Sequence, residues 1–104
     1  MYRYGWEKLH GAVHALIGPG TLRERLNSAL VSCLVRVDPT EDLPPEIRAP
    51  FAEFMAHMTS SPALGKEGDV ASTVARMSDA AVEEAAHQIL SFYVTTARVT
   101  DAQA

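Results

Sequence analysis

The stretch TLRERLNSALVSCLVRV, residues 21–37, decides the fold of this chain. Thr21 precedes Glu24 with the spacing of a capping box, so a helix is predicted to start here. Asp38 and Pro39 end it, because proline biases the preceding residue away from the helical conformation. At about 100° per residue, one face of this helix is continuously apolar. That face carries Leu22, Leu26, Ala29, Leu30, Cys33, Leu34 and Val37.

Val31 and Val35 lie on the opposite side of the same predicted helix. A helix that is apolar on two faces is either enclosed inside a fold or shared between subunits. In the first case the helices predicted over 45–59 and 79–99 cover both faces, and the chain is a monomer. In the second case the two valines bind another protein, and a two-fold dimer of the chain is the commonest arrangement of that kind.

The rest of the chain also shows helical spacing, and no segment alternates as a strand would. Further helices are predicted over 4–17, 45–59, 70–77 and 79–99. Pro50 either kinks the second of these helices or marks its true start. The core positions that they supply are Trp6, Leu9, Val13, Leu16, Ile17, Ile47, Phe51, Phe54, Met58, Val70, Val74, Met77, Val82, Ala85, Ala86, Ile89, Phe92 and Tyr93.

These elements predict an all-α fold, a compact bundle of four to five short helices with the helix over 21–37 at its centre. The chain has 104 residues, the length of one domain. We therefore expect residues 1–104 to form a single helical domain with a frayed tail at 100–104. An acidic loop is predicted over 38–44 and a flexible loop over 60–68.

The composition indicates an ordinary globular protein of a reducing compartment. Apolar residues make up 47% of the chain and charged residues 21%. Cys33 is the single cysteine and falls on the apolar face, which is typical of a small buried hydrophobe. The start of the chain lacks the pattern of a signal peptide, and no apolar run reaches the roughly 18 residues of a membrane span. We expect a cytoplasmic protein without a cofactor or a membrane partner.

The net charge of −4 is unevenly distributed along the chain. Residues 1–37 hold five basic and two acidic residues, or 5 − 2 = +3, and residues 38–104 hold four basic and eleven acidic residues, or 4 − 11 = −7. Nucleic acid is therefore an unfavourable partner, because the phosphate backbone requires a basic surface. The two halves are expected to attract each other, within the fold or across a dimer.

Glu7, His10 and His14 share one flank of the predicted first helix, within about 60° of each other. Two histidines one turn apart on a helix can chelate a transition metal. No fourth ligand is evident, so these residues are only weak candidates for a metal site. The competing interpretation is a polar rim beside the core or beside a dimer contact.

The turn Gly18-Pro19-Gly20 between the first two helices permits a helix-turn-helix interpretation. Arg23 and Arg25 would then contact phosphates or base edges from the start of the second helix. The proline in the turn and the acidic net charge argue against this interpretation. Arg23 also lies close to the apolar face, where its stem packs while its charged end reaches the surface.

No arrangement of nucleophile, general base or paired carboxylates is evident, so we do not expect an enzyme. The function predicted from the sequence is that of a small helical module for protein–protein interaction or regulation, which associates with itself or with another protein. The exposed apolar residues expected to form the interface are Val31, Val35, Tyr4, Leu90 and Val94. A DNA-associated regulator and a metal-binding protein are the alternatives.

Overall fold

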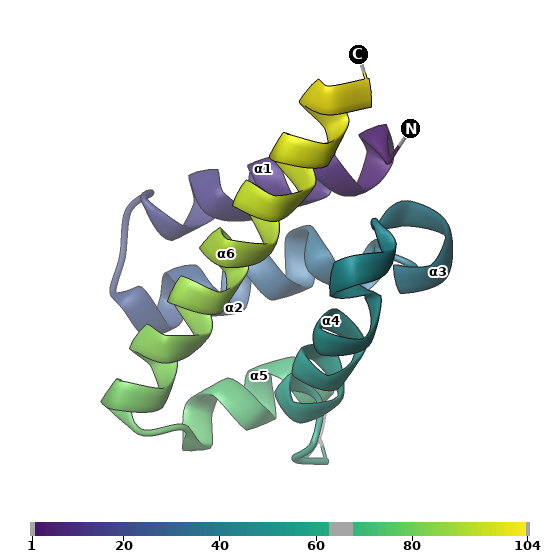
Figure 1. Ribbon diagram of the computed structural model, residues 1–104. Helices are drawn as coiled ribbons and strands as arrows, with labels where there is room; N and C mark the ends of the chain where they lie inside the picture. The colour runs from purple at the N-terminus through teal and green to yellow at the C-terminus, as the bar shows by residue number, and fades with distance from the viewer. Residues whose placement is uncertain (1, 63–67, 104) are drawn as a thin grey trace.

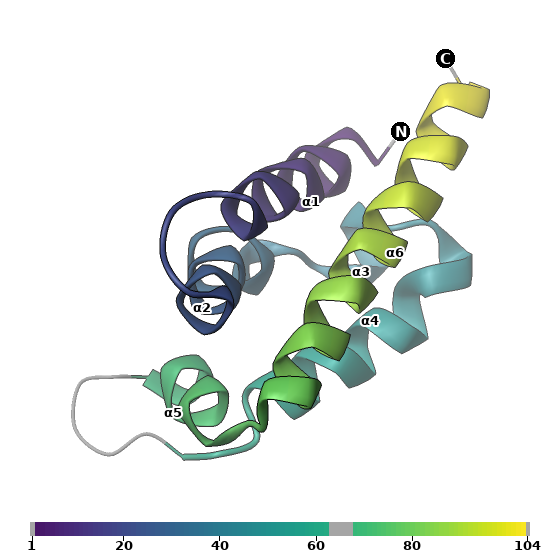
Figure 2. The same ribbon diagram turned by 90° about the vertical axis from the view of Figure 1, so that its left-hand side faces the viewer.

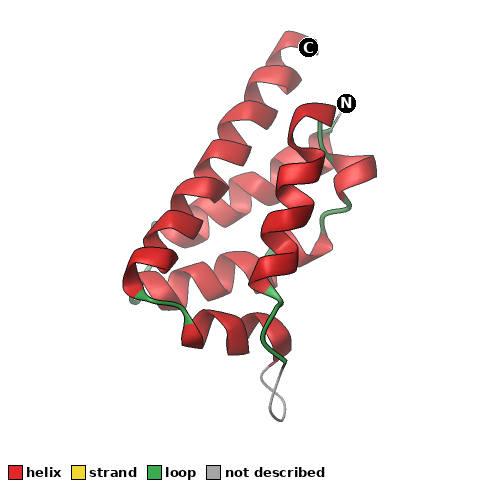
Figure 3. Ribbon diagram, turned by 60° about the horizontal axis from the view of Figure 1, so that its bottom comes forward, coloured by secondary structure: helices red, strands yellow, loops and turns green. Residues whose placement is uncertain are grey.

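Helices form the regular structure of the computed structural model, which describes residues 2–62 and 68–103. The predicted all-α class is confirmed, since Figure 3 shows the described ribbon as helices joined by short loops. The described residues hold six α-helices, more than the predicted four to five. In chain order the elements are α1 (Arg3–Leu16), α2 (Leu22–Ser32), the 3₁₀ helix η1 (Leu34–Arg36), α3 (Pro39–Asp42), α4 (Pro45–Met58), α5 (Gly68–Arg76) and α6 (Asp79–Gln103).

α2 lies between α1 and α5, and α6 crosses α1 and α2 diagonally (Figure 1). α4 contacts α5 and α6, while α3 contacts α1 and α4. The start of α1 and the end of α6 lie at the same end of the molecule, as the side view in Figure 2 also shows. Leu26, Ala29 and Leu30 of α2 are completely buried where α1, α5 and α6 meet it.

The helix predicted over 21–37 is too long, because α2 ends at Ser32. The chain then tightens into η1, where the N–H of Val37 donates to the carbonyl of Leu34 at 3.1 Å. Residues three apart lie on the same side of a 3₁₀ turn. Leu34 and Val37 are therefore both buried, whereas Val35 between them remains exposed.

The segment 38–44, predicted to be a loop, contains the short helix α3. Asp38 caps α3 by accepting the N–H of Thr40 at 3.0 Å, and Pro39 occupies the first turn, where its missing N–H costs nothing. Leu43, which the sequence analysis did not place in the core, is completely buried. α3 meets α1 at Gly5, where an added Cβ would collide with the carbonyl of Asp42.

α4 runs from Pro45 to Met58 with Pro50 inside it, so the helix does not start at Pro50. α6 continues to Gln103, past its predicted end near Val99. The frayed tail at 100–104 stays a prediction. The flexible loop predicted over 60–68 includes residues 63–67, which lie outside the described residues.

The predicted core is largely confirmed, with one clear error. Ile17 is 74% exposed rather than buried, because α1 ends at Leu16 and the chain turns away there. Gly20 has a φ of 99° in this turn, a conformation that favours glycine. In the ranges 2–62 and 68–103, no helix has the length and apolar character needed to span a membrane. The completely or almost completely buried apolar residues are Leu9, Ala12, Leu26, Ala29, Leu30, Leu34, Val37, Leu43, Ile47, Phe51, Phe54, Met58, Val70, Val74, Val82, Ala85, Ile89 and Phe92.

Candidate interaction surfaces

Val31 and Val35 are each 47% exposed, although both are large apolar side chains. Val31 lies in the last turn of α2, and Val35 lies in η1. The alternative in which neighbouring helices enclose both valines is therefore wrong. The reason is that α1, α5 and α6 pack on the side of α2 that carries Leu26 and Leu30, which are completely buried.

A hollow of about 400 Å³ lies beside Val35, between η1 and α4. The α4 side of this η1–α4 hollow includes Ala52, Met55 and Ala56, which lie one turn or less apart. None of the lining side chains is charged, and Thr59 is the one polar residue among them. The complete lining is Leu34, Val35, Val37, Pro39, Phe51, Ala52, Met55, Ala56 and Thr59. We call Val31 together with this lining the valine face.

The α4 part of the valine face was not predicted from the sequence. Phe51 and Phe54 of this segment were predicted core residues, and both are buried. Ala52, Met55 and Ala56 form a second apolar flank on the same helix, at i, i+3 and i+4. That spacing was a usable signal, because it parallels the surplus apolar side of residues 21–37.

The other three interface candidates lie on different elements. Tyr4 is 44% exposed at the start of α1, where the Nζ of Lys8 lies 5.3 Å from the centre of its ring. Leu90 and Val94 are 44% and 37% exposed, one turn apart on α6. None of the three lines the η1–α4 hollow. The structure therefore does not gather the five candidates around one hollow.

A second hollow, of about 570 Å³, lies on the other side of α4, between α4 and α6. We call it the α4–α6 groove. Its floor is formed by apolar side chains that include Phe54 and Phe92, whose rings pack edge to face with centroids 5.6 Å apart. Glu53 and Glu84 line it from opposite helices, and both residues are exposed.

Of the three weak metal candidates, His10 and His14 form part of an aromatic rim between α1 and α6, with ring centroids 4.4 Å apart, whereas Glu7 does not. The Nδ1 of His10 lies 3.3 Å from the hydroxyl of Tyr93, and the imidazole stacks on Trp6 with a centroid distance of 4.9 Å. Glu7 pairs with Arg3 instead, at 3.4 Å. No group of three or more His, Cys, Asp or Glu side chains in the described part of the chain has an arrangement that could hold a metal.

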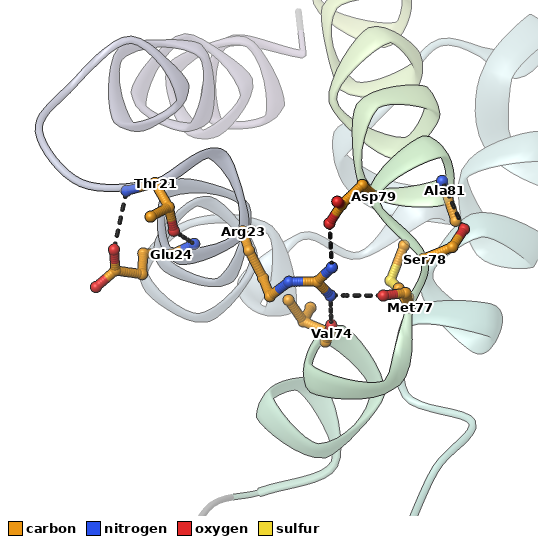
Figure 4. Close-up of polar contacts among 8 residues, drawn as sticks. All are labelled: Thr21, Arg23, Glu24, Val74, Met77, Ser78, Asp79 and Ala81. Carbon is orange, nitrogen blue, oxygen red and sulfur yellow. Dashed lines mark hydrogen bonds and ion pairs between the residues drawn. The ribbon is translucent and has the colours of Figure 1, made fainter.

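Arg23 fixes α2 to the junction of α5 and α6 (Figure 4). Its Nη1 donates to the carbonyls of Val74 at 2.6 Å and Met77 at 2.7 Å, and its Nη2 donates to Asp79 at 2.8 Å. A cation is favourable at these carbonyls because they lie at the C-terminal end of α5, where the helix dipole is negative; the Val74 carbonyl also accepts the N–H of Met77 at 3.2 Å. Arg23 is thus engaged in contacts within the molecule, and these contacts compete with the phosphate or base contacts that the helix-turn-helix interpretation assigns to it.

The capping box predicted at the start of α2 is confirmed. The backbone N–H of Glu24 donates to the Thr21 hydroxyl at 3.1 Å, and the N–H of Thr21 donates to the Glu24 carboxylate at 2.8 Å. The bond from the backbone of Thr21, followed by the bond from its side chain, lowers the pKa of Glu24 below its ordinary value of 4.5.

Comparison of the chain with models of protein families, with curated proteins and with solved structures finds no match. The exposed surfaces of the structure are therefore the basis for assigning a function.

Proposed function

We propose that this protein is a protein–protein interaction module without catalytic chemistry of its own, and that it forms a two-fold dimer through the valine face. The observation that carries this proposal is the 47% exposure of both Val31 and Val35, the second of which lines an uncharged hollow. Burial of apolar surface is the main driving force of protein association, so such a surface favours a partner.

The shape and charge of the valine face support a second copy as the partner. A two-fold contact uses the same patch on both subunits, so the patch must be complementary to itself. Val35 lines the η1–α4 hollow and is 47% exposed, so an exposed apolar group and a recess belong to one surface. Since no charged side chain lines the hollow, its lining adds no repulsion of like charges between two copies.

The experiment compares the solution mass of three proteins by size-exclusion chromatography with light scattering. Val31→Glu combined with Val35→Glu places carboxylates in the proposed contact, and burial of unpaired charge opposes association. Leu90→Glu combined with Val94→Glu is the matched control, because it makes the same replacement at exposed residues of α6. Circular dichroism verifies that both variants remain helical.

The proposal predicts a dimer for the wild type and the α6 variant and a monomer for the valine variant. A folded valine variant with the mass of the wild-type dimer would show that association uses another surface.

A further inference from the structure

The α4–α6 groove is bounded by two helices that present the same kind of stripe. From α4 the groove is lined by Pro50, Glu53, Phe54, His57 and Met58, at positions i, i+3, i+4, i+7 and i+8. The lining positions of α6 run from residue 81 to residue 92 with equivalent spacing. Stripes with this periodicity on two neighbouring helices are the surface against which a third helix packs.

The dimensions of the groove suit a short helix. Its lining positions on α6 extend from Ala81 to Phe92, which is about 16 Å along the axis at 1.5 Å per residue. A helix of two to three turns covers that length and presents apolar anchors at i, i+3 or i+4, and i+7. Ala81 and Ala85 are small residues near the start of the α6 wall, so the backbone of a bound helix can approach closely there.

The charge of the groove defines the chemistry of the partner. The apolar lining includes Phe54 and Phe92, which are only 6% and 8% exposed. Glu53 and Glu84 stand on opposite walls, and no Lys or Arg is among the lining residues. A partner that fills this groove therefore combines apolar anchors with basic residues on either side of them.

We propose that the α4–α6 groove binds a short amphipathic helix of another protein, with Lys or Arg flanking its apolar stripe. This site is separate from the valine face, which lies on the opposite flank of α4. One face thus joins two copies of the chain, and the groove of each copy binds a basic helix.

The test uses a synthetic, fluorescein-labelled peptide of about 15 residues, near the length at which an isolated helix becomes marginally stable. It has Leu at i, i+3, i+4 and i+7 and Lys on both flanks, and a second peptide has Glu in place of each Lys. Fluorescence anisotropy measures binding to the full chain. We expect saturable binding of the lysine peptide with a Kd below about 1 mM, weakening as salt is added, and much weaker binding of the glutamate peptide.

Two groove variants locate the binding. Glu53→Lys combined with Glu84→Lys is expected to weaken binding of the lysine peptide at least about tenfold, since like charges then face each other. The matched control is Glu41→Lys combined with Glu83→Lys, which changes the net charge equally at exposed residues outside the groove, and we expect a change of less than about threefold. Ala81→Trp fills the groove without changing the charge and is expected to abolish binding.

Three results would overturn the proposal: no saturable binding, equal binding of the two peptides, or an equal loss of affinity for the lysine peptide in the groove and control variants. The mass of the dimer is an independent readout. The groove variants are expected to leave it unchanged, so failure of this proposal is distinguishable from failure of the valine-face dimer.

Discussion

Gly5→Ala is expected to destabilise the protein strongly, whereas Gly11→Ala is expected to be nearly neutral. Both glycines belong to α1, and alanine is a better helix former than glycine by up to about 1 kcal/mol. A Cβ at Gly5 would overlap the backbone carbonyl of Asp42, so α1 and α3 would have to separate. A Cβ at Gly11 would lie 3.1 Å from the Sγ of Cys33, a side-chain atom that can move by a few tenths of an ångström.

The size of the stability change in each variant follows from these two environments. Overpacking a filled interior costs about 1–3 kcal/mol, and the upper end applies at Gly5 because the obstacle is backbone. After the gain in helix propensity, we expect Gly5→Ala to lower the free energy of unfolding by about 2 kcal/mol. In a domain of this size that loss lowers Tm by roughly 10 °C. For Gly11→Ala the gain in helix propensity and the steric strain against Cys33 offset each other to within about 0.5 kcal/mol.

Urea unfolding followed by far-UV circular dichroism at one fixed protein concentration measures both variants, because association makes stability depend on concentration. If Gly5→Ala were as stable as Gly11→Ala, the close approach of α1 and α3 would be refuted.

Two further predictions concern the start of α2. Arg23→Met removes the guanidinium from the carbonyls of Val74 and Met77 and is expected to lower the free energy of unfolding by about 2 kcal/mol. Arg25→Met removes a longer bond, in which the Nε of Arg25 donates to the Thr21 carbonyl at 3.3 Å, and should lower it by less than about 0.5 kcal/mol in the same urea assay. Equal losses of stability would contradict the proposed role of Arg23. The lowered pKa of Glu24 means that its ionised form stabilises the fold above its ordinary pKa of 4.5, and that this contribution is lost as the pH falls through the folded-state value. The stability difference between wild type and Glu24→Gln, measured from urea midpoints, should therefore be larger at about pH 7 than at about pH 3, and a difference that grew on acidification would be inconsistent with the capping geometry.

Local patterns were predictable from the sequence, and distant contacts were not. The capping box of Thr21 and Glu24 was recognisable because its partners are three residues apart, and both of its bonds are present. The end of α2 was missed because a uniform 100° per residue was extended through a segment that tightens into η1. The contacts of Arg23 join residues that are 51 to 56 positions apart, a separation at which no periodicity operates.

The candidate surface was predictable only in part, for the same reason. Val31 and Val35 were identified because surplus apolar side chains on a helix are visible in its periodicity, and their exposure agrees with that interpretation. The η1–α4 hollow depends on how α4 is placed against η1, which the sequence of neither segment specifies. The burial of Leu43 likewise depends on α3 approaching α1 at Gly5, a tertiary contact.

The mass of the wild-type chain in solution, measured by light scattering over a tenfold range of concentration, tests the central claim most directly. The valine-face dimer predicts a mass near twice the 11.3 kDa of one chain, at least at the upper concentrations. A mass of 11.3 kDa at every concentration would contradict self-association.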